Sequence, residues 1–500
     1  MSIGLFEILC GIFALFVALY YYFSSPLSYW MTRGIPGPEP VPLYGNLKPM
    51  MFGQMSVGDF VKQQYDQYKD QPVFGIYASR TPILIINDPE LIKEVLIRSF
   101  SSFASRGIRI FEKVEPLSAN LVNLEPARWK PLRAKQTTMF TSAKLKDMFN
   151  LVLECADSLE KVLEKITSEN EVVECCEVAA RYTTDVIGAC AFGIDMKALG
   201  DEESEFRKVG KRFTHADKWR AFKIRFKQIC PGLYQLLRPI MYDHEINDFF
   251  IGSMMQTMKY RKENNIRRGD FVDLLIDLKD NPEKLDTIEL TDTLLTAQAF
   301  AFFFAGFDTS ATTIGHALYE LALNKRIQSE LRKEIIKELG NCGGRFSYSG
   351  IENMKYLHKV FNETLRKYPV ATILTRQATE PYTFSQIGLK IPKDMRVWVP
   401  VFGIHRDPKI YPDPEKFDPE RFDDDVAKGR HQSHYLPFGV GPRNCIGARF
   451  GTYQTKIGII TIVKNYELDI CEKTSIPYKI NPRKFLLGPA EGINLTLRKL

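Results

Sequence analysis

Residues 438–447 read Phe-Gly-Val-Gly-Pro-Arg-Asn-Cys-Ile-Gly, and no other stretch says more about the fold. Three glycines and a proline in so short a segment favour a backbone that turns tightly beside a flat ligand. The next segment, 448–463, has a helical pattern, which places Cys445 at a helix N-terminus where the dipole stabilises a thiolate. A free thiol with a pKa of about 8.5 is only a few per cent ionised at neutral pH, so a metal or a positive environment must supply the rest.

The composition excludes several classes of protein. Hydrophobic residues make up 45% of the 500 and charged residues 25%, which argues against disorder and against a multi-span membrane protein. The net charge of +7 is small for a nucleic-acid binder, and no nucleic-acid partner is expected. The nine cysteines are scattered, odd in number and without a Cys-x-x-Cys pair, which argues against a disulfide framework and a structural zinc site.

Helical periodicity dominates the rest of the chain. Apolar residues recur at helical spacing in 145–166, 178–192, 249–263, 291–323 and 351–367. Short β-branched and aromatic runs at 73–77 and 82–86 predict a hairpin, and 391–401 predicts a second β region with its turn at 392–394. The sequence therefore predicts a mainly α fold with small β-sheets.

Within the longest helical pattern, residues 305–310 read Ala-Gly-Phe-Asp-Thr-Ser. Asp308 and Thr309 would be costly to bury without partners, and Gly306 weakens a helix. Such coinciding penalties are typical of functional sites. The alternative is that Thr309 bonds the carbonyl of its own helix.

The pattern Phe-x-x-Gly-x-Arg-x-Cys-x-Gly at 438–447 resembles the haem-binding loop of the cytochrome P-450 superfamily, and the family's other motifs follow its order along nearly the whole chain. The resemblance implies the haem-thiolate fold, a haem b whose iron is bound by Cys445, and monooxygenase activity. Phe438, Gly439 and Gly447 would be the loop's other cofactor contacts. Asp308 and Thr309 would help to deliver protons during oxygen activation.

The two haem propionates need cations, preferably guanidinium groups. By the same resemblance Trp129 and Arg133, together with Arg376 and Arg443, would contact them, and Arg106 is a fifth candidate. A further motif, Glu363-Thr364-Leu365-Arg366, could be an ordinary surface ion pair. The resemblance instead makes Glu363, Arg366 and Arg421 a buried triad with a structural role.

The N-terminus predicts a membrane anchor. Residues 3–23 are apolar apart from Glu7 and, at roughly 1.5 Å per residue, match the roughly 30 Å of a hydrocarbon core. A cleaved signal peptide is the competing interpretation, but a basic region before the apolar run is missing. Arg33 and Lys48 follow the span, which places the rest of the chain in the cytosol. The expected units are an anchor at 1–25, a proline-rich hinge at 26–49 and a catalytic domain at 50–500.

These expectations combine into a single-pass monooxygenase of the endoplasmic reticulum, or microsomal, membrane that inserts one oxygen atom from O2 into lipophilic small molecules. Electrons would come from NADPH through a cytochrome reductase, with cytochrome b5 as a second donor, because the chain lacks a glycine-rich dinucleotide fingerprint. The acidic reductase would dock on Arg128, Lys130, Lys135 and Arg449. Rival hypotheses are a peroxide-using or isomerase relative that needs no reductase and a non-catalytic haem sensor.

The chain resembles insect microsomal members associated with detoxification, which implies xenobiotic substrates such as plant compounds and insecticides. An endogenous hormone or fatty acid is the alternative. Expected pocket walls are apolar: 302–304, 370–374 and 485–487. Cations and aromatics alternate at 218–227, where a helix would place Trp219, Phe222 and Phe226 on one side. That side either packs inward or gives a second contact with membrane lipid.

Overall fold

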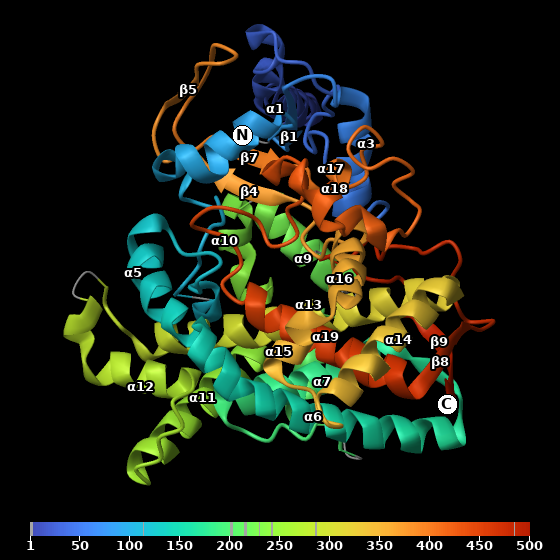
Figure 1. The fold of residues 1–500 in the computed structure, drawn as a ribbon. Coiled ribbons are helices and arrows are strands. Elements are labelled where there is room, and N and C mark those ends of the chain that lie inside the picture. Colours follow the sequence, from blue (N-terminus) through green and yellow to red (C-terminus); the bar gives the residue numbers. More distant parts are fainter. Residues whose placement is uncertain are drawn as a thin grey trace.

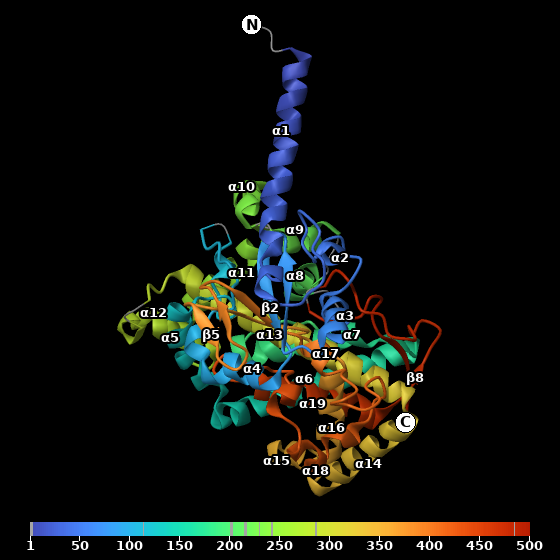
Figure 2. The same ribbon diagram turned by 90° about the horizontal axis from the view of Figure 1, so that it is seen from above.

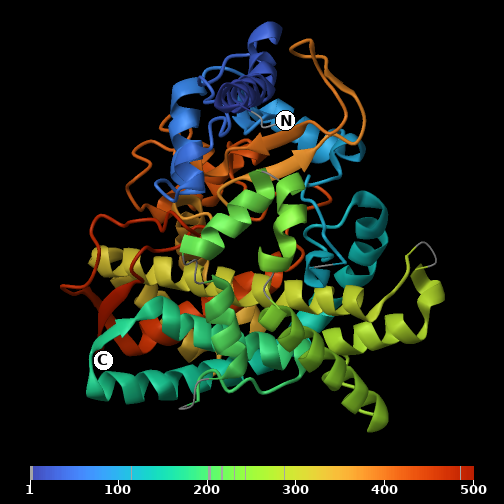
Figure 3. The same ribbon diagram turned by 180° about the vertical axis from the view of Figure 1, so that it is seen from behind.

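A long central helix organises the structure, a computed structural model that describes residues 4–113, 115–200, 204–214, 218–229, 231–241, 244–285, 288–484 and 486–500. This helix, α13 (Asp292–Leu323), starts where the Thr291 hydroxyl accepts a hydrogen bond from the N–H of Leu294. It crosses the middle of the molecule between α19 on one side and α11 on the other (Figures 1 and 3). Most of its residues from Leu294 onward are buried, so its apolar pattern reflects packing on nearly every face.

Helices α7 and α19 pack directly against α13, and the other helices apart from α1 complete the body of the protein. Their bounds are α1 Leu5–Ser24, α2 Lys48–Met51, α3 Val57–Tyr68, α4 Pro89–Lys93, α5 Pro126–Thr137, α6 Ser142–Glu169, α7 Cys175–Ile187, α8 Glu205–Thr214, α9 Lys218–Ile229, α10 Pro231–Met241, α11 His244–Glu263, α12 Phe271–Asp280, α14 Lys325–Asn341, α15 Tyr348–Asn353, α16 Lys355–Lys367, α17 Val401–Ile404, α18 Asp424–Lys428 and α19 Ala448–Asn465.

Three small sheets complete the fold. Their strands are β1 Val73–Ala78, β2 Thr81–Ile86, β3 Val172–Glu174, β4 Leu374–Gln377, β5 Tyr382–Phe384, β6 Leu389–Ile391, β7 Arg396–Val399, β8 Tyr466–Ile470 and β9 Asn494–Lys499. The largest sheet has the order β1-β2-β7-β4, in which β2 and β7 pair in parallel although they are far apart in the sequence. The other sheets are β3-β9-β8 and β5-β6.

The mainly α fold and the early hairpin are confirmed, because β1 and β2 pair antiparallel around Ser79, whose φ is 54°. Two expectations need correction. The single helix expected over 351–367 is two helices, α15 and α16, separated at Met354. The expected turn at 392–394 does not join paired strands, since β6 pairs with β5 whereas β7 pairs with β2 and β4.

Helix α1 projects away from the body of the protein (Figure 2). Its apolar side chains are exposed, and Phe6, Phe13 and Phe16 keep 67–78% of their surface. The most apolar 18-residue window within residues 6–33 has a mean hydropathy of 1.9, and the segment is long enough to cross a membrane. Helix α1 is therefore a candidate membrane anchor; residue 3, where the expected span starts, lies outside the described residues.

Candidate active site

The loop at 438–447 is held by its own backbone. The N–H of Cys445 donates to the carbonyl of Phe438 at 2.8 Å, and α19 begins at Ala448, as the sequence predicts. Gly439 and Gly441 have φ of 66° and 77°. A Cβ on Gly441 would lie 2.0 Å from the carbonyl oxygen of Leu96, so both conformation and space require glycine there.

The Cys445 thiol is accessible although the protein around it is dense. Its side chain is exposed, yet the surrounding protein is dense enough that burial raises the pKa of the thiol. The N–H of Gly447 and the charges of Arg133 and Arg106 act in the opposite direction and favour the thiolate. An exposed thiol in dense surroundings borders a space inside the protein, where it can reach a ligand.

Cationic side chains gather beside this thiol. Arg133 Nη2 donates to Asn444 Oδ1 at 3.0 Å, and Arg106 Nη2 donates to the Arg443 carbonyl at 3.2 Å. The Arg443 guanidinium lies 4.5 Å from the centre of the Trp129 ring. The structure thus brings Trp129, Arg133, Arg106 and Arg443 together from segments that are far apart in the sequence.

Burial and mutual repulsion outweigh the attraction of nearby carboxylates for these arginines, although Glu125 acts on Arg443. Burial, reinforced by repulsion from Arg106, lowers the pKa of Arg376 to about 9. Burial together with Arg106 and Arg376 lowers the pKa of Arg443 to about 9 as well. Within the described part of the chain, Arg443 Nε and Nη1 and Arg376 Nε are buried without a hydrogen-bond partner. Buried guanidinium groups of this kind call for an anionic ligand.

The motif at 305–310 lies in the middle of α13. Ala305 is exposed and Asp308 and Thr309 are partly exposed, although burial raises the pKa of Asp308. This turn therefore also borders space inside the protein. The Thr309 hydroxyl donates to the Ala305 carbonyl at 2.6 Å, which is the local bond that the sequence left as the alternative.

Gly306 has a packing reason that the sequence did not reveal. A Cβ at this position would lie 2.1 Å from Ile187 Cδ1 of α7. The glycine therefore permits α7 and α13 to approach closely, in addition to weakening its own helix. The Gly306 carbonyl also accepts a bond of 2.9 Å from Gln454 Nε2 of α19, and the Phe307 carbonyl accepts one of 2.9 Å from the Thr183 hydroxyl of α7.

The expected triad lies together. Arg366 and Glu363 form a fully buried pair at 2.7 Å, and Arg421 Nε lies 3.5 Å from Glu363 Oε1. Sequence reasoning missed His405, whose Nε2 accepts the N–H of Leu436 at 2.9 Å and whose Nδ1 lies 3.2 Å from the Arg366 carbonyl. Burial lowers the pKa of His405 to about 3, so the neutral ring links Arg366 of the triad to Leu436, two residues before the Cys445 loop.

A sequence model of the family described as cytochrome P-450 matches residues 35–495. This chain belongs to the cytochrome P-450 family. Cytochrome P-450 6A1 of Musca domestica is 38% identical over 96% of this chain and 95% of the relative. Cytochrome P-450 6k1 of Blattella germanica is 37% identical over 97% and 95%, and probable cytochrome P-450 6a23 of Drosophila melanogaster is 39% identical over 99% of each chain.

Membership in the cytochrome P-450 family makes the chain a monooxygenase that binds haem through an axial cysteine thiolate. The residues present fit this cofactor. Cys445 supplies an accessible thiol, and the unpartnered buried nitrogens of Arg376 and Arg443 are the donors that haem carboxylates require.

Two sets of expected residues behave differently from the prediction. Arg128 forms ion pairs with Glu112 and Glu125 at 2.8 and 2.7 Å, so its charge is already matched within the chain. Phe303 is fully buried among other rings and is not a pocket wall, whereas Phe304 keeps partial exposure. Phe485, another expected wall residue, lies outside the described residues.

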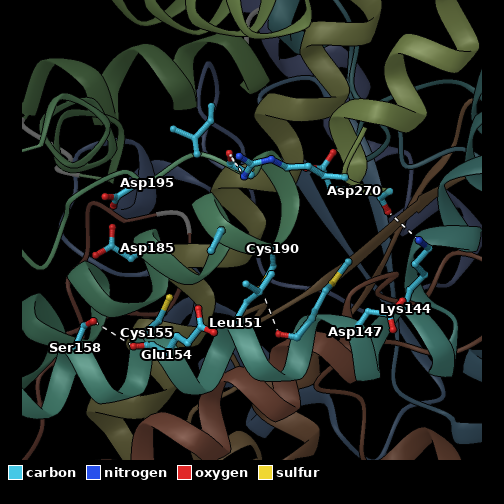
Figure 4. Close-up of a pocket in the computed structure, with 16 residues that line it drawn as sticks. Lys144, Asp147, Leu151, Glu154, Cys155, Ser158, Asp185, Cys190, Asp195 and Asp270 are labelled. Atoms are coloured by element: carbon cyan, nitrogen blue, oxygen red, sulfur yellow. Dashed lines mark hydrogen bonds between the residues drawn. The ribbon is translucent and has the colours of Figure 1, made fainter. Parts of the chain in front are cut away.

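A cavity of about 500 Å³ lies away from this site, between α6, the end of α7 and the turn before α12 (Figure 4). It contains none of the motif residues. Two of its carboxylates already have partners: Asp185 accepts the N–H groups of Ala198 and Leu199, and Asp270 pairs with Arg261 at 2.6 Å. The cavity therefore carries no functional assignment.

Proposed function

We propose that this chain is a membrane-anchored monooxygenase of lipophilic small molecules in which Cys445 is the iron ligand. The observation that carries the assignment of Cys445 is the cluster of arginines with unpartnered nitrogens beside an accessible thiol. When bound, the haem supplies the oxidising chemistry, and the protein supplies binding, orientation and protons.

The absorption spectrum of the reduced, carbon-monoxide-bound protein tests this assignment. Wild-type protein should show the strongly red-shifted Soret band of thiolate ligation, and Cys445→His should lose it. Cys342→Ser removes a thiol elsewhere in the chain and should keep the band. A wild-type protein without the band, or a Cys445→His variant that retains it, contradicts the proposal.

We assign proton delivery to Thr309 and Asp308. The Thr309 hydroxyl uses its proton to bond the Ala305 carbonyl, which leaves its oxygen lone pairs able to accept a hydrogen bond from water. Burial favours the protonated form of Asp308, whereas Lys484 and Arg207 favour the carboxylate. Thr309→Ala should therefore release more hydrogen peroxide for each NADPH consumed, and an unchanged ratio excludes this role.

Electrons are proposed to arrive from NADPH through a cytochrome reductase, with cytochrome b5 as a second donor. Lys130 and Arg449 are exposed and Lys135 is partly exposed, so these three remain as a docking surface. Arg128 is withdrawn from that surface because Glu112 and Glu125 neutralise it.

The endoplasmic reticulum membrane is the proposed location, with the body of the protein on the cytoplasmic side. Helix α10 supports a second membrane contact, because Leu233, Leu236 and Ile240 are 49–77% exposed along one face. On α9, Trp219 stacks with Phe222 as the helical spacing predicts, and Trp219 is 53% exposed. Both helices lie on the side of the body from which α1 projects (Figure 2).

Xenobiotics are the proposed substrates, since the phenylalanines of α13 next to the Asp308 turn offer aromatic surface. Phe302 and Phe304 remain wall candidates among the phenylalanines at 302–304, because both keep partial exposure. Turnover of a panel of plant compounds, insecticides, hormones and fatty acids tests this. A preference confined to one hormone or fatty acid would favour the endogenous alternative.

A further inference from the structure

Three consecutive carbonyls of α13 accept hydrogen bonds from side chains at the turn that carries Asp308 and Thr309. The Ala305 carbonyl is bonded within the helix by Thr309, but the next two are bonded from other helices. Gln454 Nε2 of α19 donates to the Gly306 carbonyl at 2.9 Å. The Thr183 hydroxyl of α7 donates to the Phe307 carbonyl at 2.9 Å.

Both of these tethers are deep in the protein. Gln454 and Thr183 are fully buried, and Gln454 Oε1 has no hydrogen-bond partner among the described residues. The amide of Gln454 is thus held mainly through its donor side. A helix carbonyl has two lone pairs, so it can accept from such a side chain in addition to the N–H four residues later. The extra bond then ties the turn to the neighbouring helix.

Close packing gives these two bonds a fixed geometry. On α19, Gly458 lies against α13, where an added Cβ would be 2.7 Å from Ile314 Cδ1. Gly451 also faces Ser310 of α13, although the 3.7 Å between an added Cβ and the serine hydroxyl is ordinary contact. Gln454 lies between these two glycines along one face of α19. The close contact at Gly458 therefore holds α19 near α13 beside the residue that makes the bond.

We propose that Gln454 is a positioning residue that fixes the Ala305–Thr309 turn relative to the Cys445 loop. Helix α19 starts directly after this loop, so one rigid element carries both the segment next to Cys445 and the amide that bonds Gly306. Thr183 supplies a second, independent tether from α7. The inference rests on the proposed roles of Cys445, Asp308 and Thr309.

The test compares Gln454→Met, which keeps the size of the side chain and removes the donor, with Thr461→Val. Thr461 is also buried on α19, and among the described residues its hydroxyl bonds the Ile457 carbonyl of its own helix and no other helix. Hydrogen exchange of the peptide covering residues 300–312 is measured on the haem-loaded protein. We expect exchange roughly three- to tenfold faster in Gln454→Met, the factor that one hydrogen bond of ordinary net strength represents, and wild-type exchange in Thr461→Val.

A second readout follows the chemistry. Hydrogen peroxide released per NADPH consumed, with an alkoxycoumarin as the lipophilic probe, should rise in Gln454→Met while the carbon-monoxide band stays at its wild-type position. Thr183→Val should act in the same direction, and Thr183→Ser should restore wild-type behaviour because it keeps the hydroxyl.

The proposal is overturned if Gln454→Met matches Thr461→Val in both exchange and peroxide release. If Gln454→Met does not fold, the Thr183 variants provide the test. Equal exchange and equal peroxide release in Thr183→Val and Thr183→Ser then overturn the proposal. A third outcome separates the two proposals. If Gln454→Met exchanges faster but releases no extra peroxide, and Thr309→Ala also releases no extra peroxide, the tether is supported and the proposed role of Thr309 is contradicted.

Discussion

The pair formed by Glu363 and Arg366 gives the sharpest test of what holds the protein together behind the Cys445 loop. Arg366 Nε lies 2.7 Å from Glu363 Oε2 and Arg366 Nη2 lies 2.8 Å from Oε1, in a bidentate contact that is fully buried. We expect Glu363→Met to lower the free energy of unfolding by about 3–5 kcal/mol, because the charge of Arg366 is left buried without its partner. Backbone carbonyls of His405 and Pro414 still accept from Arg366 but carry no full charge.

Removing both charges should cost less than removing one. A buried ion pair replaced by apolar side chains of similar volume is often neutral in stability, so the double variant Glu363→Met/Arg366→Met should be more stable than Glu363→Met alone. Urea unfolding followed by circular dichroism measures both. The control is Glu330→Met on the exposed pair with Lys333, where no measurable loss is expected. Additive losses in the double variant, or a Glu363→Met variant as stable as the control, would refute the reasoning.

Three further predictions concern Gly306, two buried histidines and Lys130. Gly306→Ala should lower the free energy of unfolding by about 1–3 kcal/mol through its clash with Ile187, and Ile187→Val should recover part of this loss in a double-mutant cycle; no recovery would mean that the clash is not the cause. His316 and His405 have pKa values of about 3 in the folded protein, below the ordinary 6.5, so the unfolded chain takes up protons first on acidification. Their contribution to the free energy of unfolding is complete above pH 6.5 and is lost toward pH 3, at about 1.4 kcal/mol per pH unit for each ring. When the free energy of unfolding is measured at several pH values, its slope against pH should be shallower in His316→Phe than in wild type. Lys130→Glu should slow reductase-supported turnover at low salt and leave peroxide-supported turnover unchanged, whereas equal rates with reductase would remove Lys130 from the docking surface.

Local patterns predicted those parts of the protein that depend on neighbouring residues. The glycines of the Cys445 loop were readable because a left-handed φ at Gly439 and Gly441 is a property of those residues themselves. The periodicity of 291–323 predicted α13 almost to the residue. It failed at 351–367, where a continuous helical pattern hid the break at Met354.

The sequence alone determined the family, the helix-rich class and the candidate residues, because each is encoded in residue types at short, fixed spacing. Only the tertiary structure decided which candidates meet and what they touch. It withdrew Arg128 from the docking surface, gave Gly306 a packing role against Ile187, and revealed His405 and Gln454 as links between the Cys445 loop and its surroundings. Gly306 and Gln454 contact residues more than a hundred positions away in the chain. Arg128 pairs with Glu112 and His405 accepts from Leu436 over shorter separations that follow no helical or strand period.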